Sequence, residues 1–152
     1  MKYFLLLFSL LFSLSAQAND LLLSFSPTMD GGYTPKLVQV GYEHDFSHPV
    51  ALVAECGGMF EGENIGTCSI VPSIKVQTLS GLVARVGVGP GFVTATDSRL
   101  SSIFEFHIQG FFGLEQDGWQ VGILGDHFSN AGLVLPNLGR DFVGLGVGIK
   151  VF

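Results

Sequence analysis

The sequence predicts an all-β fold, an eight-stranded antiparallel transmembrane β-barrel. Three observations lead to this prediction: an N-terminal segment typical of exported proteins, a low content of charged residues, and an alternation of apolar and polar residues from residue 19 onward. Alternation with a period of two is typical of strands that have two different faces. Turn residues and many of the 21 glycines interrupt it repeatedly, which divides the chain into short strands.

Residues 1–18 have the form of a secretory signal peptide. Lys2 precedes a short apolar run, and the small-residue pattern AQA ends at Ala18. The run is shorter than the roughly 20 residues that a helix needs to cross a bilayer. We therefore expect cleavage after Ala18 and a single barrel domain over residues 19–152.

The composition argues against a soluble domain and against nucleic-acid binding. Hydrophobic residues make up 47% of the chain and charged residues 13%, whereas a soluble domain carries roughly 25% charged residues. Thirteen acidic residues against seven basic ones give a formal net charge of −6, so no basic surface is available for phosphates. Beyond the signal segment, no apolar run reaches roughly 20 residues, and a closed barrel is the other way to satisfy the backbone in lipid.

Eight segments are expected to form strands, the smallest common number in membrane barrels. They cover residues 20–27, 34–45, 49–59, 67–78, 81–94, 101–115, 119–129 and 141–152. Short connections alternate with longer ones at residues 29–32, 60–65, 95–100 and 130–140. Outer-membrane barrels place short turns on the periplasmic side and long loops outside, so the connection 130–140 is predicted to be extracellular.

The two faces of the predicted strands differ as in a membrane barrel. In segment 81–94 the even positions are apolar, whereas the odd positions carry glycine, valine and Arg85. We expect the apolar face to contact lipid, the reverse of a soluble lipocalin-like barrel. The charged residues expected on lumen-facing positions are Glu43, Glu55, Lys75, Arg85, Glu105, His107, Asp126 and Lys150. Eight strands leave little room for a pore, so a paired polar core is favoured over a channel.

Cys56 and Cys68 are the only cysteines of the chain. Both fall on even positions of neighbouring predicted strands, so their side chains share a face. An exported chain meets an oxidising compartment, which favours a disulfide between them. Two free thiols are the alternative, and a metal pair lacks further ligands nearby.

Three polar residues in the segment GDHFSNAGLVLPNLGRDF have the side-chain types of a serine hydrolase. His127 and Ser129 fall on odd positions of segment 119–129, which face lipid. A simple hairpin sets Ser129 opposite Asp141, with His127 diagonal to it. An imidazole can take the proton of a serine hydroxyl while a carboxylate orients the imidazole. The structural alternative is that all three are ordinary polar residues of the barrel rim.

The predicted depth of these residues in the membrane keeps the energetic cost of polar groups on the lipid face low. Trp119 marks the periplasmic interface, and a tilted strand crosses the bilayer with about 9 to 11 residues. Ser129 is therefore expected at the outer interface, where a charged group on the lipid face costs roughly 0 to 1 kcal/mol instead of 2 to 4 at the midplane. The ester bonds of membrane lipids lie at this depth.

The string HFSNAGLVLPNLGRDF, followed by one more strand and the terminal Phe152, resembles the PagL family of outer-membrane lipid A 3-O-deacylases. The resemblance is closest over residues 122–152. It implies a triad on the barrel exterior, with His127 as general base, Ser129 as nucleophile and Asp141 as the orienting acid. The pattern that it resembles has Glu at the position of Asp141, whose side chain is one methylene shorter.

The resemblance also implies the function and the roles of three loop residues. Asn130 becomes a candidate oxyanion donor, and Asn137 and Arg140 become candidates for shaping the loop or contacting substrate. The expected reaction is hydrolysis of the ester-linked 3-hydroxyacyl chain at position 3 of lipid A, in the outer leaflet of a Gram-negative outer membrane.

Neither a metal nor a cofactor is expected for this reaction. Lipopolysaccharide is the expected partner, and a homodimer is left open. The rival functions are a non-enzymatic outer-membrane barrel with a structural or adhesion role and a soluble lipocalin-like carrier.

Overall fold

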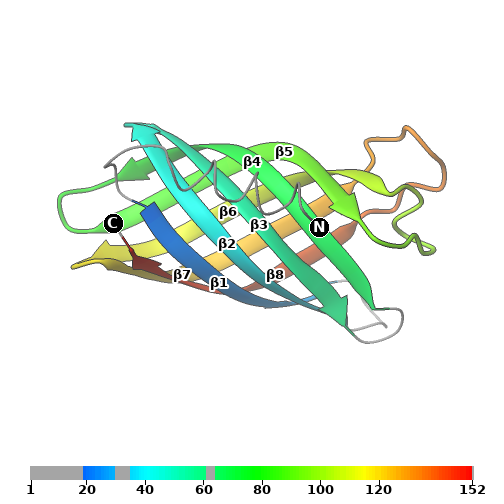
Figure 1. Ribbon diagram of the computed structural model, residues 1–152, viewed down its shortest axis with the longest axis horizontal. Coiled ribbons are helices and arrows are strands. Elements are labelled where there is room, and N and C mark those ends of the chain that lie inside the picture. The colour runs from blue at the N-terminus through cyan, green and yellow to red at the C-terminus, as the bar shows by residue number, and fades with distance from the viewer. Residues whose placement is uncertain (1–18, 30–34, 61–63, 152) are drawn as a thin grey trace, which may run out of the picture.

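The computed structural model describes residues 19–29, 35–60 and 64–151. The predicted signal peptide, residues 1–18, and Phe152 lie outside the described residues. The described chain forms eight strands: β1 (Asn19–Pro27), β2 (Lys36–Ser47), β3 (Val50–Phe60), β4 (Ile65–Gln77), β5 (Leu82–Val93), β6 (Phe104–Gln116), β7 (Trp119–Ser129) and β8 (Arg140–Lys150). All neighbours are antiparallel, and β1 pairs with both β2 and β8, which closes the barrel (Figure 1). The predicted fold class is confirmed.

The two ends of the barrel differ in the length of their connections. Turns at residues 48–49, 78–81 and 117–118 join strands at one end. The connections 94–103 and 130–139 join strands at the opposite end, the right-hand end of Figure 1. Among the described residues, no helix is long and apolar enough to cross a membrane.

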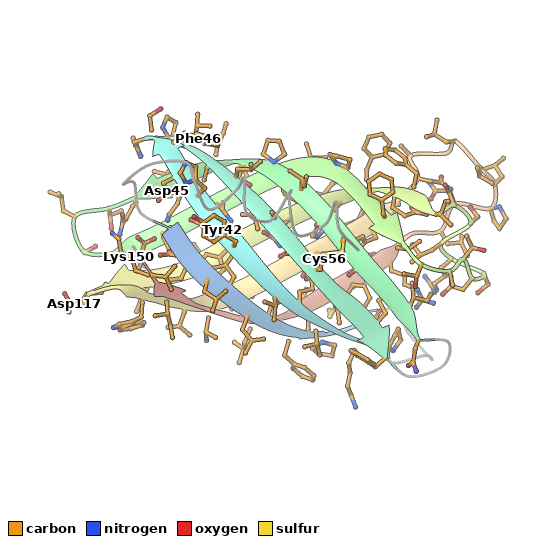
Figure 2. All side chains as sticks on the ribbon, viewed as in Figure 1. Tyr42, Asp45, Phe46, Cys56, Asp117 and Lys150 are labelled. Atoms are coloured by element: carbon orange, nitrogen blue, oxygen red, sulfur yellow. A yellow bond between two sulfur atoms is a disulfide. The ribbon has the colours of Figure 1, made fainter. Side chains whose placement is uncertain are left out.

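Side chains alternate between the lumen and the outer wall along the strands. On β7, for example, Leu124, Asp126 and Phe128 are buried, whereas Val121 and Ile123 are exposed on the wall. Side chains project outward along the whole barrel surface (Figure 2). The predicted lipid-facing parity of β4 to β8 is therefore confirmed.

The lumen is filled with packed side chains, apolar near the long loops and largely polar in the middle. The apolar cluster consists of Leu37, Met59, Ile65, Val93, Leu100, Phe128 and Phe142. A second, smaller apolar cluster lies toward the short turns and joins Val83, Phe111 and Leu124. At the short-turn end a polar cavity of about 520 Å³ opens, with Asp20, Glu115 and Lys150 in its lining.

The two central cations of the lumen are paired with carboxylates, as the sequence predicted. Lys75 Nζ lies 2.6 Å from Glu43 Oε1, 2.8 Å from Glu115 Oε2 and 3.1 Å from Asp45 Oδ2. Arg85 pairs with the other carboxylate oxygen of Glu43. These contacts join strands from different parts of the barrel and offset the cost of burying the charges.

Cys56 and Cys68 lie directly opposite each other on β3 and β4 and are joined by a disulfide. Figure 2 labels Cys56 on β3. The bond links residues that are 12 apart in sequence, and a closed loop of this size contributes about 3 kcal/mol by restricting the unfolded chain.

Removing the buried cation should destabilise the barrel. Lys75→Met leaves three carboxylates without their shared partner, and we expect the free energy of unfolding to fall by about 3 kcal/mol. Urea titration of the refolded protein in lipid or detergent measures this. Lys150→Met is the matched control, because Lys150 is exposed at the barrel mouth and an exposed substitution changes stability by about 0.5 kcal/mol or less. Equal losses in the two variants would contradict the assigned role of the buried pairs.

Candidate active site

His127, Ser129 and Asp141 come together on the outer wall at the long-loop end of the barrel. His127 and Ser129 lie on the outward face at the end of β7, and Asp141 lies on the outward face at the start of β8. The His127 side chain is 34% exposed and the Asp141 side chain 56% exposed. All three side chains are therefore accessible from outside the barrel.

The register of the hairpin differs from the predicted one. His127 pairs directly with Asp141, and Phe128 pairs with Arg140. The expectation that Ser129 faces Asp141, with His127 diagonal, was wrong by two residues. The strand β8 begins at Arg140, so that the loop ends in Gly139 beside Ser129. A shift of two residues keeps every side chain on its predicted face.

Direct pairing brings the carboxylate into contact with the imidazole. Asp141 Oδ1 lies 2.7 Å from His127 Nδ1. A carboxylate only accepts hydrogen bonds, so Nδ1 carries the hydrogen and donates it. The lone pair of the neutral ring is then at Nε2, the atom that can accept a proton. The shorter Asp side chain reaches the histidine because no diagonal step is needed.

Ser129 shares the outward face with His127, two residues further along β7. The described residues show no hydrogen bond between Ser129 Oγ and the imidazole, and the N–H of Ala131 approaches Oγ at 3.4 Å. On β6, Phe106 lies opposite Ser129 and Ile108 opposite His127. The serine hydroxyl thus lies in an apolar wall, next to an imidazole that Asp141 already orients.

Gly139 fits tightly between the two outward side chains. A Cβ at this position would lie 2.9 Å from His127 Cε1 and 3.3 Å from Ser129 Cβ. Its φ of +66° lies in the left-handed region that favours glycine. No pattern in the sequence marks this glycine, because the need for it arises from its contact with the histidine in the folded chain.

Asn130 is fully buried and holds the loop together. Its Nδ2 donates to Ser101 Oγ at 2.8 Å and to the Val134 carbonyl at 2.9 Å, while its Oδ1 accepts from the Gly132 N–H at 2.9 Å. Both amide hydrogens are engaged. The expectation that the Asn130 side chain donates to an oxyanion does not fit this geometry.

Asn137 has a different arrangement within the same loop. Its Oδ1 accepts from the backbone N–H of Asn130 at 3.2 Å, and the described residues offer no acceptor to its Nδ2. This contact keeps the Asn137 amide close to the backbone that follows Ser129.

Arg140 is buried and points away from the outward site. Its guanidinium pairs with Asp97 of the neighbouring loop 94–103. Partial burial raises the pKa of Asp97, but the backbone N–H groups of Leu100 and Arg99 and the Arg140 guanidinium outweigh it and hold that pKa below its ordinary value. Arg140 braces the two loops, and the expectation that it contacts substrate does not fit its burial.

A second serine, histidine and aspartate lie together inside the lumen. Ser69 Oγ is 2.8 Å from His107 Nδ1, and His107 Nε2 is 2.9 Å from Asp126 Oδ1. All three residues are buried, His107 completely. A substrate ester cannot reach this serine, so the array serves packing rather than hydrolysis.

The lumen array is also a poor metal site. Candidate ligand atoms of Glu55, His107 and Asp126 lie within 4.8 Å of one another. However, the two carboxylates lie at opposite nitrogens of the same imidazole, Glu55 Oε1 at 3.2 Å from Nδ1 and Asp126 Oδ1 at 2.9 Å from Nε2. One ion cannot bind both sides of the ring, so these residues fit a hydrogen-bonded core better than a metal centre.

A family model described as lipid A 3-O-deacylase (PagL) matches residues 8–150. The chain belongs to this family. It is therefore an outer-membrane β-barrel enzyme that hydrolyses an ester of lipid A, and the predicted function is confirmed at this level. No curated protein matches the chain significantly.

Comparison with solved structures supports the same fold. The crystal structure of the outer membrane enzyme PagL superposes with a TM-score of 0.75 at 22% identity, covering 87% of this chain and 99% of that one. The N-terminal β-barrel domain of Pseudomonas aeruginosa OprF gives 0.68 at 16% identity over 90% and 100% of the chains. Yersinia pestis Ail gives 0.60 at 9% identity over 90% and 100%.

Filling the space at Gly139 should impair the enzyme. Gly139→Ala places a methyl group against the His127 ring, and a displacement of this kind is expected to lower kcat about tenfold or more. Gly132→Ala is the matched control, since Gly132 also has a positive φ, +82°, but has open space around its Cβ position. Release of fatty acid from lipid A measures both variants. If they lose activity equally, backbone strain and not the histidine contact is responsible.

Proposed function

We propose that this PagL-family enzyme uses His127, Ser129 and Asp141 as a serine-esterase triad that removes the 3-hydroxyacyl chain from position 3 of lipid A. The observation that carries the proposal is the 2.7 Å contact between His127 Nδ1 and Asp141 Oδ1 on the outer wall, beside an accessible serine. The lumen offers a similar set of residues but no access for a lipid.

In the proposed reaction, Ser129 Oγ attacks the ester carbonyl and His127 Nε2 takes the hydroxyl proton. The tetrahedral intermediate collapses to an acyl-serine, and His127 returns the proton to the departing sugar oxygen. Water then attacks the acyl-serine with His127 again as base, which releases the 3-hydroxy fatty acid and restores Ser129. Asp141 keeps the ring in the required tautomer and stabilises its charged form.

Asn137 is the best candidate for stabilising the oxyanion. Its Nδ2 has no acceptor among the described residues, and its Oδ1 is held at 3.2 Å by the N–H of Asn130, the residue after Ser129. An amide donor fixed in advance stabilises negative charge that develops on the carbonyl oxygen. The Asn130 side chain supports this arrangement from within the loop.

The proposed site acts at the outer leaflet of the outer membrane. Ser129 lies at the long-loop end of β7, and Trp119 lies at the other end of the same strand. All three triad residues come from one chain, so the proposal requires no second copy. We further propose that residues 1–18 are an export signal that is removed, leaving residues 19–152 as the barrel domain.

The nucleophile can be tested with two serine substitutions in the same barrel. Ser129→Ala is expected to abolish deacylation, because removing the nucleophile of a serine hydrolase costs on the order of 10⁶ in kcat. Ser69→Ala changes the serine of the lumen array and is expected to retain activity. Mass spectrometry of lipid A from cells that express each variant shows whether one hydroxyacyl chain is lost. Continued loss of the chain with Ser129→Ala would contradict the assignment.

His107 is expected to act as a positioning residue for His127 from inside the barrel. Its ring stacks on Phe128 at 4.1 Å between centroids, and its Nε2 bonds Asp126 at 2.9 Å. It thereby holds both sequence neighbours of His127.

Removing the contacts of His107 with Phe128 and Asp126 should lower kcat with little change in KM. His107→Ala removes both contacts, and a fall in kcat of about tenfold is expected from displacement of the outward histidine. His107→Phe keeps a ring against Phe128 and should recover part of the loss. Electrophoretic mobility of the unheated protein reports that the barrel is closed. A folded His107→Ala variant with unchanged kcat would disprove the positioning role.

A further inference from the structure

The loop between β7 and β8, residues 130–139, exposes an unusual amount of apolar surface. Leu133, Val134, Leu135 and Leu138 are 67%, 44%, 80% and 62% exposed. The loop contains no charged residue. Soluble surfaces seldom show apolar side chains gathered in this way, and such patches mark contact with another apolar phase.

Several backbone groups of the same loop form hydrogen bonds within the protein. The N–H groups of residues 131–133 donate to acceptors on Ser129 or Asn130, and Pro136 has no N–H to satisfy. The carbonyl of Val134 accepts from two side chains. Because an unpaired backbone group is costly in hydrocarbon, this partial bonding fits a backbone that stays at the membrane interface, from which the apolar side chains can reach the acyl chains.

The apolar surface of the loop continues onto the lipid-facing wall. Ser101 Oγ donates to the Val134 carbonyl at 3.1 Å, which ties the loop to the start of β6. There Ile103 is 63% exposed, and the outward Phe104 packs edge-to-face on Phe92 at 5.5 Å. The wall already faces lipid, so the loop extends an existing membrane contact instead of forming a separate patch.

Asn130 and Arg140, at the two ends of this loop, point toward the barrel and away from the exposed apolar side chains. Asn130 is fully buried, and Arg140 is buried against Asp97. The loop therefore has a polar side that bonds the barrel rim and an apolar side that faces outward, beside Ser129.

We propose that residues 131–138 form a lip at the outer interface whose apolar side chains enter the hydrocarbon of the outer leaflet, with lipid acyl chains as their partner. The lip fixes how deeply the outward face of β7 lies in the membrane. An ester group can then reach Ser129 while the other acyl chains of its lipid stay in the bilayer. The insertion rests on the outer-membrane placement of the barrel and does not depend on which residue is the nucleophile.

The depth of the loop can be measured by tryptophan fluorescence. Trp119 is the only tryptophan, so Trp119→Phe provides a background without tryptophan emission. Leu135→Trp in this background reports on the lip. Ser98→Trp is the matched control, since Ser98 is exposed in the polar loop 94–103 at the same end of the barrel. Both variants are reconstituted into phosphatidylcholine vesicles with brominated acyl chains, and into unbrominated vesicles with acrylamide in the water.

The tryptophan at position 135 should be quenched by the brominated chains and protected from acrylamide, and the one at position 98 should behave in the opposite way. The preference of tryptophan itself for interfaces is common to both variants, so it cannot produce the difference. Quenching of position 135 by acrylamide to the same extent as position 98 would overturn the proposal. Protection from both quenchers would also overturn it, because the loop would then pack on protein, such as a second copy. Neither quenching measurement depends on catalysis, so both remain valid if the triad assignment fails.

Discussion

A membrane-spanning wall must bond all its backbone N–H and C=O groups within the protein, and the closed ladder from β1 to β8 meets this requirement. The ladder has a mechanical consequence for the site. Along β7, Asp126 and Phe128 point into the lumen and His127 and Ser129 point to lipid, so neither set can move without the other. Packing inside the barrel therefore determines the geometry available outside it.

The two arrays of serine, histidine and aspartate illustrate how environment decides chemistry. Ser69, His107 and Asp126 are bonded at 2.8 and 2.9 Å but are enclosed by the barrel. The outer array keeps only the 2.7 Å contact of His127 with Asp141 and is open to the membrane. Catalytic hydrogen bonds in a free enzyme are often long and tighten when substrate binds. Under the proposed assignment, access to the membrane, more than the hydrogen-bond geometry of the free protein, distinguishes the outer triad from the lumen array.

The long loops complete the outer site by separating polar from apolar groups. Asn130 and the pair of Arg140 with Asp97 bond inward and fasten the loops to the rim. The apolar side chains of residues 133–138 are left outward, next to the histidine and serine. Under the proposed assignment no cleft is needed, because the bilayer would cover the side of the substrate that the wall does not.

The barrel, and the face on which each strand residue lies, could be predicted from the sequence alone, because a period of two and turn chemistry are local properties. The sequence also placed His127 and Ser129 on the outer wall. The pairing of Asp141 with His127 instead of Ser129 could not be predicted in this way, since a register shift of two residues preserves every face and leaves no trace in the pattern. Three further contacts arise only in the folded chain: the hydrogen bond of Asn130 to Ser101, the ion pair of Arg140 with Asp97 and the close approach of Gly139 to His127. They depend on two loops that meet in space, and distances between separate loops are not encoded in the spacing of residues along the chain.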